Sequence, residues 1–215
     1  MSRILVATTN PGKLREIRRI LAHIPVELLS LSDFPRVAEP EETGATFEEN
    51  ARLKALYYDE ALAAAARESG PIDTVAEDSG LVIDALNGDP GVQSARFLRP
   101  DASYPERFAE IFRRLAARPS VLRTARFVAA VAMVRASTVI FETTATVEGE
   151  IALEARGDRG FGYDPIFYYP PYGSTLAEVT DDEKIAIAHR GRAFRKLGEW
   201  LESTERRTKG MFPVP

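Results

Sequence analysis

The segment RILVATTNPGKLREIRRIL, residues 3–21, decides the fold of this chain. Residues 3–8 are a short apolar run rich in β-forming side chains, which predicts a buried strand. Asn10 suits the N-terminal cap of a helix, and Pro11 suits the first helical position, where its missing N–H costs nothing. The residues that follow place apolar side chains at helical spacing. The segment therefore predicts a strand–turn–helix unit, as found in α/β proteins.

Strand and helix patterns continue through the rest of the chain. They predict strands at residues 26–31, 74–78, 81–86 and 163–169, a hairpin of strands 121–135 and 137–148, and helices at 46–67, 103–117, 180–189 and 192–201. Thr46 and Thr180 each precede a glutamate by three positions, which is the signature of a capping box. We expect an α/β fold with a mixed central β-sheet flanked by helices, and two lobes around a central substrate cleft. Residues 1–203 form one such domain in this prediction, and residues 204–215 form a C-terminal tail that is frayed from residue 208.

Composition excludes several classes of protein. The chain has 215 residues, of which 45% are hydrophobic and 28% charged, so it is typical of a globular protein rather than a disordered or fibrous one. No apolar run is long enough to cross a bilayer, and the first residues lead into the predicted strand without the apolar core of a signal peptide. The net charge of −4 argues against a general nucleic-acid-binding protein, and the lack of cysteine excludes disulfides and thiolate sites. We therefore expect a cytoplasmic protein with no membrane or nucleic-acid partner.

Charges and rare residue types are unevenly distributed. Residues 39–49 carry five glutamates and no basic residue, whereas residues 189–209 carry seven basic residues and three glutamates. Such stretches are usually solvated faces, but they could also meet across a cleft that binds a metal–anion complex. The chain has only five lysines, three asparagines, one glutamine and two histidines. Positions that retain these scarce types are therefore candidates for function.

The turn after the first predicted strand is the first candidate site, and its residues are Thr8, Thr9, Asn10, Pro11, Gly12 and Lys13. The start of a helix presents free N–H groups and the positive end of the helix dipole, which favours an anion such as phosphate. Gly12 permits close approach of a ligand, and Lys13 adds a positive charge. The spacing is not that of a P-loop. An ordinary capped helix start is the alternative.

The second candidate is the acidic segment with Glu41 and Glu42 and the helix that follows it. Phe47, Asn50 and Lys54 fall on one side of that helix. A side that carries an aromatic ring, a scarce amide and a scarce lysine is not a normal core face. A capped surface helix is the alternative.

The third candidate is Glu77-Asp78-Ser79-Gly80. Adjacent strand residues point to opposite faces, so Glu77 and Asp78 should not share one task unless the strand breaks at Ser79 and Gly80. A carboxylate where a strand ends suits a hard cation such as Mg²⁺. Carboxylates at strand ends are also common in turns.

Two later segments suggest recognition of a flat ligand. Phe161 lies between Gly160 and Gly162, an arrangement that suits a ring stacking on a purine better than a core residue. Further along the chain, His189 and Arg190 could donate to a carbonyl-bearing ring, although a histidine at a helix end is also favoured by the dipole. Together the segments supply phosphate, metal and base recognition, with no motif for acyl or hydride transfer. The residues therefore predict a Mg²⁺-dependent nucleoside phosphate hydrolase or binding protein.

Five ordered motifs closely resemble the inosine triphosphate pyrophosphatase family, and they occupy residues 7–13, 46–51, 77–81, 161–165 and 189–191. The resemblance runs from about residue 3 to residue 200. It implies hydrolysis of ITP, dITP and XTP to the nucleoside monophosphate and pyrophosphate, a requirement for Mg²⁺, a two-lobed α/β fold and a homodimer.

The resemblance also implies roles for individual residues. Asp78 would be the general base and, with Glu42, a Mg²⁺ ligand. The residues that would bind the substrate are Thr8, Thr9, Asn10, Gly12, Lys13, Lys54, Ser79, Phe161, Gly162, Tyr163, Asp164, Lys184, His189 and Arg190. Two features depart from the family pattern, namely Glu77 at a position where bacterial members usually have Asp, and the aromatic stretch Tyr168–Tyr172.

Two alternatives remain open at this point. A non-catalytic nucleotide sensor on the same fold is favoured by Glu77 alone. A pyrophosphatase for a different modified nucleotide would share every motif. Guanine has the same 6-carbonyl as the expected substrates, so an enzyme that excludes GTP must recognise the 2-amino group of guanine. The sequence does not indicate which residues do so.

Overall fold

The first strand and helix form where the sequence predicts them. The computed structural model describes residues 2–63, 70–118 and 121–210. Strand β1 (Ser2–Val6) turns into helix α1 (Pro11–Ile20), and the Asn10 side chain caps this helix by accepting hydrogen bonds from the N–H groups of Gly12 (2.9 Å) and Lys13 (3.1 Å). These bonds satisfy two of the donors that a helix start leaves free.

A seven-stranded mixed sheet forms the centre of the molecule, in the order β2-β1-β3-β4-β5-β6-β7. Strand β1 is parallel to β2 and β3, and the later neighbours are antiparallel. The other strands are β2 (Val26–Ser30), β3 (Asp73–Ile83), β4 (Thr124–Arg135), β5 (Thr138–Ile151), β6 (Phe167–Tyr169) and β7 (Ser174–Thr175). The predicted mixed α/β class and the predicted hairpin, β4–β5, are confirmed.

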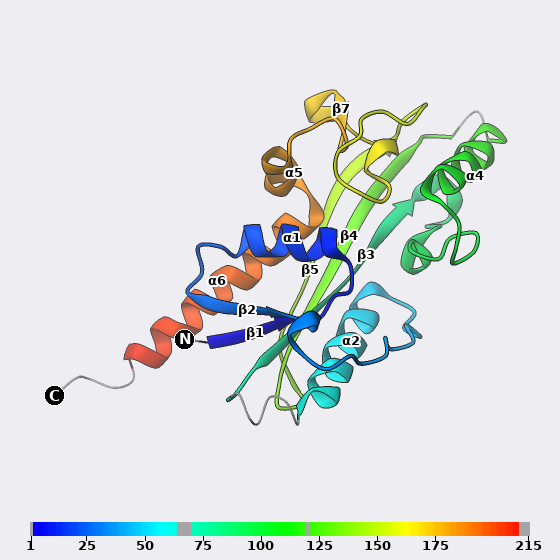
Figure 1. Ribbon diagram of the computed structural model, residues 1–215. Helices are drawn as coiled ribbons and strands as arrows, with labels where there is room; N and C mark the ends of the chain where they lie inside the picture. The colour runs from blue at the N-terminus through cyan, green and yellow to red at the C-terminus, as the bar shows by residue number, and fades with distance from the viewer. Residues whose placement is uncertain (1, 64–69, 119–120, 211–215) are drawn as a thin grey trace.

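Helices cover both faces of the sheet. They are α2 (Phe47–Ala61), α4 (Tyr104–Ala116), α5 (Asp181–Ile187) and α6 (His189–Gly210), in addition to α1. Apolar residues of α1 and α6 pack together with β1, β3 and β4, while α2 packs against β3 and β4 in a separate cluster. Figure 1 shows α1 and α6 lying over the sheet, with α2 on its other side. The sheet is therefore the middle of three layers.

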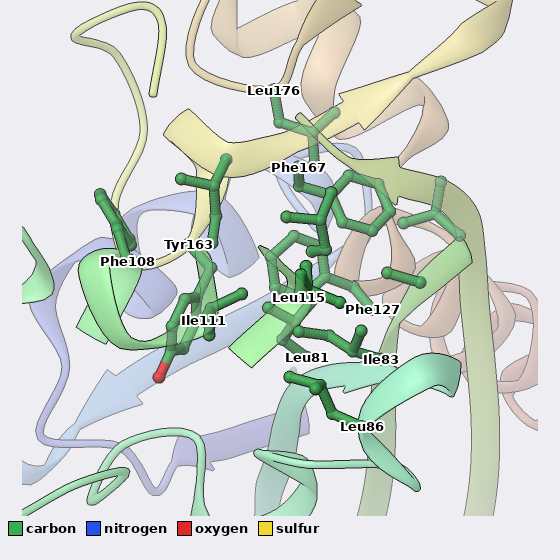
Figure 2. Close-up of a cluster of buried hydrophobic side chains, with 14 of the residues drawn as sticks. Leu81, Ile83, Leu86, Phe108, Ile111, Leu115, Phe127, Tyr163, Phe167 and Leu176 are labelled. Atoms are coloured by element: carbon green, nitrogen blue, oxygen red, sulfur yellow. The ribbon is translucent and has the colours of Figure 1, made fainter. Parts of the chain in front are cut away.

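The long strands β3, β4 and β5 connect two groups of elements (Figure 1). At one end lie β1, β2, α1, α2 and most of α6, and at the other lie α4, β6 and β7. The second end has its own apolar cluster, in which Leu81, Phe108, Ile111 and Phe127 take part (Figure 2). Among the described residues, no helix has the length and apolarity needed to cross a membrane.

Strand β3 differs from its prediction, because it runs without a break through Ser79 and Gly80. Gly80 pairs with Val128, and a Cβ there would lie 2.6 Å from the carbonyl oxygen of Gly91. The glycine therefore marks the close approach of another segment rather than the end of a strand. The predicted strand 81–86 stops at Ile83, after which a 3₁₀ helix forms at Asp84–Leu86.

Other predicted boundaries also change. Residues Asp164–Ile166 form a 3₁₀ helix, so only the end of the predicted strand 163–169 is extended. Helix α2 ends at Ala61, and part of its predicted extension to residue 67 lies outside the described residues. Helix α6 continues to Gly210, past the predicted tail boundary at 204, and residues 211–215 lie outside the described part.

The junction between α5 and α6 corrects the position of His189. The capping box of Thr180 and Glu183 forms as predicted, but α5 ends at Ile187, and Ala188 is extended. Helix α6 begins at His189 rather than at Arg192. His189 therefore lies at the start of a helix, where the dipole disfavours a positive charge, and not at a helix end that would favour one.

Candidate active site

Strand β3 extends beyond the end of β1, and the residues of this extension carry the central carboxylates of the site. The last residue of β1, Val6, lies opposite Val75, so the next residues of β3 pass the turn that leads into α1. Glu77 and Asp78 follow directly, and both are buried. Their side chains have different partners on opposite faces of the sheet, as the alternation of a strand predicts.

The face that carries Asp78 holds a cluster of carboxylates and a lysine. Lys54 Nζ lies 2.8 Å from Asp78 Oδ1 and 2.8 Å from Glu42 Oε1. Asn50 donates to Asp78 Oδ2 at 3.2 Å, and Arg96 donates to Glu42 Oε2. Helix α2 therefore presents Asn50 and Lys54 to Asp78, which confirms that these residues share one side of the helix.

The charges in this cluster stabilise one another. Burial alone would lower the pKa of Lys54, but the carboxylates of Asp78 and Glu42 outweigh it and hold that pKa above its usual value. Burial would raise the pKa of Glu42, but Lys54 and Arg96 together outweigh it, so the pKa of Glu42 lies below its usual value. At neutral pH, Lys54 is therefore charged and Glu42 is ionised.

The face that carries Glu77 holds a buried ion pair. Arg190 donates to Glu77 through Nε (2.7 Å) and Nη2 (2.8 Å), a two-point contact. Burial would raise the pKa of Glu77, but Arg190 and then Lys13 outweigh it and lower that pKa well below its usual range. Burial would lower the pKa of Arg190, but Glu77 and then Glu16, a residue of α1 that also contacts this guanidinium, outweigh it and raise that pKa.

Glu16 extends this pair into a network. Its two oxygens contact Lys184 (2.9 Å) and Arg190 (2.5 Å), and Lys184 also contacts Asp164 (2.5 Å). Burial would lower the pKa of Lys184, but Asp164 and Glu16 outweigh it and raise that pKa. Helix α1 is therefore tied by charge to α5 and to the start of α6.

Lys13, near the start of α1, interacts with charged groups on both faces. Its Nζ is 3.9 Å from Glu77 Oε1, and the side chain is 17% exposed. Burial lowers the pKa of Lys13, with smaller contributions from Arg190 and Lys54, while Glu77 and Asp78 act in the opposite direction. Lys13 therefore interacts electrostatically with both the Glu77 pair and the Asp78 cluster.

A pocket opens beside this network. Predicted residues that line it are Asn10, Lys13, Ser79, Phe161, Gly162, Tyr163, Asp164, Lys184, His189 and Arg190. The Phe161 ring has Lys184 Nζ 4.5 Å and Arg190 Cζ 5.3 Å from its centre, so two cations hold it. Phe161 also lies against Gly12, where a Cβ would be 2.8 Å from the ring. Gly12 therefore allows the ring to pack on the start of α1.

His189 is buried in the pocket wall with its ring stacked on Phe127 at 4.8 Å. Burial, followed by the charge of Arg190, lowers its pKa well below the usual value, so the imidazole is neutral at neutral pH. Its Nδ1 atom is buried without a hydrogen-bond partner. A neutral imidazole offers one donor and one acceptor, and the residue lines the pocket.

Some predicted residues lie elsewhere or are already engaged. Thr9 is exposed and faces a separate hollow formed with residues 31–39, and Thr8 Oγ1 accepts from the N–H of Asn10. The N–H groups of Gly12 and Lys13 serve the Asn10 cap, so a phosphate would have to meet the Lys13 side chain or compete with that cap. Among the described His, Asp and Glu residues, no group of three is arranged as a complete metal site.

Several residues of the site have no sequence signal that singles them out. Glu16 lies on the polar face of α1, where the sequence pattern predicts a solvated side chain. Arg96 is one of 23 arginines, so its residue type does not distinguish it. Ser94, Ala95 and Tyr104 line the pocket from a segment without a recognised motif. The scarcity argument could not find them, because serine, alanine, glutamate and arginine are not scarce in this chain.

Comparison with known proteins identifies the family of this chain. Residues 4–200 match the model of the Ham1 family. The chain is 45% identical to a dITP/XTP pyrophosphatase of Geobacillus kaustophilus, over 94% of this chain and 95% of the relative, and 43% identical to one of Halalkalibacterium halodurans, over 94% and 100%. It superposes on a HAM1 protein from Coxiella burnetii with a TM-score of 0.81 at 38% identity, over 94% of this chain and 100% of the other. The resemblance drawn from the five motifs is confirmed, and the chain belongs to the Ham1 family.

Proposed function

We propose that this protein hydrolyses non-standard purine nucleoside triphosphates, namely dITP, ITP and XTP, to the nucleoside monophosphate and pyrophosphate. The curated relatives at 43–45% identity are named dITP/XTP pyrophosphatases. The observation that carries the proposal is that Lys13 lines the pocket and also interacts electrostatically with Lys54 and Asp78 of the carboxylate cluster. A nucleotide with its base against Phe161 has its phosphates directed toward lysines and carboxylates.

In the proposed reaction, water attacks the α-phosphorus. A bond forms between the water oxygen and phosphorus, the bond from phosphorus to the bridging oxygen breaks, and pyrophosphate leaves. Asp78 accepts the proton of the water. Its two oxygens are held by Lys54 and Asn50, which fixes the orientation of the carboxylate and leaves lone pairs for a water molecule. Lys13 and Lys54 neutralise charge on the phosphates.

The cluster also fits a divalent cation. Glu42 and Asp78 both lie 2.8 Å from the same Nζ, so their oxygens converge, and carboxylate oxygens are hard ligands. We propose that these two residues hold Mg²⁺, with water and phosphate oxygens completing the ligands. When bound, Mg²⁺ would supply positive charge to the phosphates of the leaving group.

At the other end, we propose that Phe161 stacks on the purine and that His189 and Arg190 face its 6-carbonyl. His189 lines the pocket with a neutral ring, which has one donor and one acceptor. Arg190 is largely committed, because it already donates to Glu77, Glu16 and Ser79. It therefore contributes mainly a fixed positive charge. Adenine carries an amino group at this position. It would turn a hydrogen-bond donor toward the positive charge of Arg190, which would then have no acceptor from the base.

The alternative of a non-catalytic sensor loses its supporting feature. Glu77 is the partner of Arg190 and lies on the opposite face from Asp78, so its longer side chain does not disturb the carboxylate cluster.

We also propose that the protein acts in the cytoplasm as a homodimer. Leu122 and Leu153 are 78% and 84% exposed, and sedimentation of wild type and of a Leu153→Ser variant tests whether they take part in the contact.

The proposal is tested with a panel of triphosphates carrying hypoxanthine, xanthine, adenine, guanine, uracil and methylated bases. Expected are pyrophosphate as first product, dependence on added Mg²⁺, and much faster turnover of ITP and XTP than of ATP and GTP. Equal rates on all bases, or orthophosphate as first product, would overturn it. A preference for another modified base would favour a different pyrophosphatase.

Asp78→Asn tests the general base. This variant should lose most turnover, by about 10²–10⁴-fold, because a general base contributes in that range, and it should still bind ITP. The matched control is Asp84→Asn, since Asp84 is exposed and bonded to Thr124 and Arg126 away from the pocket. Near-normal turnover of Asp78→Asn would remove Asp78 from this role.

A further inference from the structure

Hypoxanthine, xanthine and guanine share one edge and differ at another. All three carry a carbonyl at C6 and an N–H at N1, so groups that bind this edge cannot separate them. At C2 they carry hydrogen, oxygen and an amino group respectively. If His189 and Arg190 face the C6 edge, as proposed above, GTP has to be refused by a different wall of the pocket.

A second wall of the pocket, built from Ser94, Tyr104 and Tyr163, supplies further polar atoms. In this wall the hydroxyl and the carbonyl of Ser94 are both engaged in hydrogen bonds. Its hydroxyl oxygen accepts from the N–H of Leu81 (2.9 Å) and donates to the carbonyl of Gly91 (2.6 Å). Its carbonyl oxygen accepts from the Tyr163 hydroxyl (2.8 Å) and from Arg107 Nη1 (3.3 Å). A carbonyl has two lone pairs, so this one has none left for a ligand donor.

Arg107 reaches this wall from inside the protein. It lies on α4, is 4% exposed, and has its guanidinium 5.0 Å from the centre of the Tyr104 ring. It donates to the backbone carbonyls of Ser94 and Pro100 and also interacts with the hydroxyl groups of Tyr104 and Tyr163, and no described carboxylate forms an ion pair with it. Its Nε is buried without a partner. A buried arginine is normally paired with a carboxylate, so the wall carries an uncompensated positive charge.

The Tyr163 ring is part of the apolar cluster at this end of the molecule, and Figure 2 shows its hydroxyl oxygen at the margin of that cluster. The ring packs edge-on against Tyr104 with centres 5.3 Å apart. This packing fixes the hydroxyl, so the hydrogen bond to Ser94 is held in place.

We propose that Arg107 and Tyr163 determine the selectivity of the pocket at purine C2, by occupying the Ser94 carbonyl and making the wall positive. An amino group at C2 would be buried against this wall without an acceptor and beside a like partial charge. A C2 hydrogen needs no partner, and a C2 oxygen is attracted by the charge. The inference rests on the proposed function, because it concerns the same pocket.

The experiment compares Arg107→Met with Arg113→Met, an exposed arginine of the same helix that pairs with Glu110. For each protein, kcat/KM is measured with ITP, XTP and GTP, and Kd is measured with IMP, XMP and GMP. Arg107→Met should raise the GTP-to-ITP ratio about tenfold, the worth of one buried hydrogen bond gained. It should lower the XTP-to-ITP ratio, and the monophosphates should follow. Arg113→Met should keep the wild-type ratios.

A merely structural role for Arg107 would lower all three activities together and leave the ratios unchanged, which would overturn the proposal. If Arg107→Met does not fold, Tyr163→Phe removes only the hydroxyl and should raise the GTP-to-ITP and GMP-to-IMP ratios in the same direction. Unchanged ratios in Tyr163→Phe would equally overturn it. Failure of wild type to hydrolyse ITP at all would instead overturn the proposed function, and the monophosphate ratios would still test the wall.

Discussion

Replacement of Glu77 by Gln tests whether the buried network around Arg190 depends on a carboxylate. Gln has nearly the same shape, so the change removes the negative charge and one of the two acceptors for Arg190. Glu77 and Arg190 side chains are 1% and 3% exposed, and the pair is joined by two hydrogen bonds. In Glu77→Gln, Arg190 keeps Glu16 as its one remaining carboxylate.

The size of the effect follows from burial. Removing one partner of a buried ion pair costs about 3–5 kcal/mol, since it leaves a charge without compensation. Because Glu16 stays in contact and Gln still offers one acceptor, we expect the lower end of this range, about 3 kcal/mol. For a chain of this size that corresponds to a fall in Tm of roughly 6–12 °C.

The assay is urea and thermal unfolding of wild type and Glu77→Gln at neutral pH, with Glu142→Gln as control. Glu142 also accepts two hydrogen bonds from an arginine, Arg52, but both side chains are largely exposed. Solvent screens such pairs, so the control should change stability far less. If Glu77→Gln is no less stable than Glu142→Gln, the reasoning about the buried network is wrong.

Acid provides a second check on the same variant. The pKa of Glu77 in the folded protein lies below its usual value of 4.5, so its contribution to stability is fully present above pH 4.5. It is lost only as the pH falls through the lower folded pKa. The stability difference between wild type and Glu77→Gln should therefore stay constant at neutral pH and shrink below about pH 4.5.

Three further variants test the packing and charge of the site. Gly80→Ala should lower the unfolding free energy measured in urea by more than 1 kcal/mol, a typical cost of overpacking, because its Cβ would lie 2.6 Å from the Gly91 carbonyl; wild-type stability would show that the turn moves freely. Gly12→Ala should raise KM for ITP more than it lowers kcat, because its Cβ would push against Phe161, and an unchanged KM would contradict this. His189→Gln should weaken the loss of stability on acidification, because the folded protein resists protonating His189 while the unfolded chain takes up that proton near pH 6.5. An equal slope below pH 6.5 in wild type and His189→Gln would show that His189 is not held neutral.

Local sequence patterns predicted the parts of the fold that depend on neighbouring residues. Asn10 and Pro11 start α1, and Thr180 with Glu183 starts α5, because a cap needs only groups three or four positions apart. At Thr46 the cap forms too, but Glu49 accepts from the N–H of Ala45 rather than Thr46. Strand alternation likewise predicted that Glu77 and Asp78 point to opposite faces.

The break expected at Ser79 and Gly80 was wrong for a reason that lies outside the local sequence. Glycine weakens a strand on its own, but ten residue pairs join β3 to β4 and hold the strand through that point. The turn that carries Gly91 and Ser94 packs on the space that Gly80 leaves. Tertiary pairing therefore overrode a local preference.

The sequence by itself determined the class of fold, the family and the residues whose types are scarce, such as Lys13, Asn50 and His189. It did so because capping, periodicity and motif order are local properties of the chain. Only the tertiary structure decided which charges meet. Glu16 and Arg190 are 174 positions apart, and Tyr163 and Ser94 are 69 apart, so nothing in the order of residues connects them. Burial then gives these contacts their strength, because a charge or a carbonyl removed from water must find its partner within the fold.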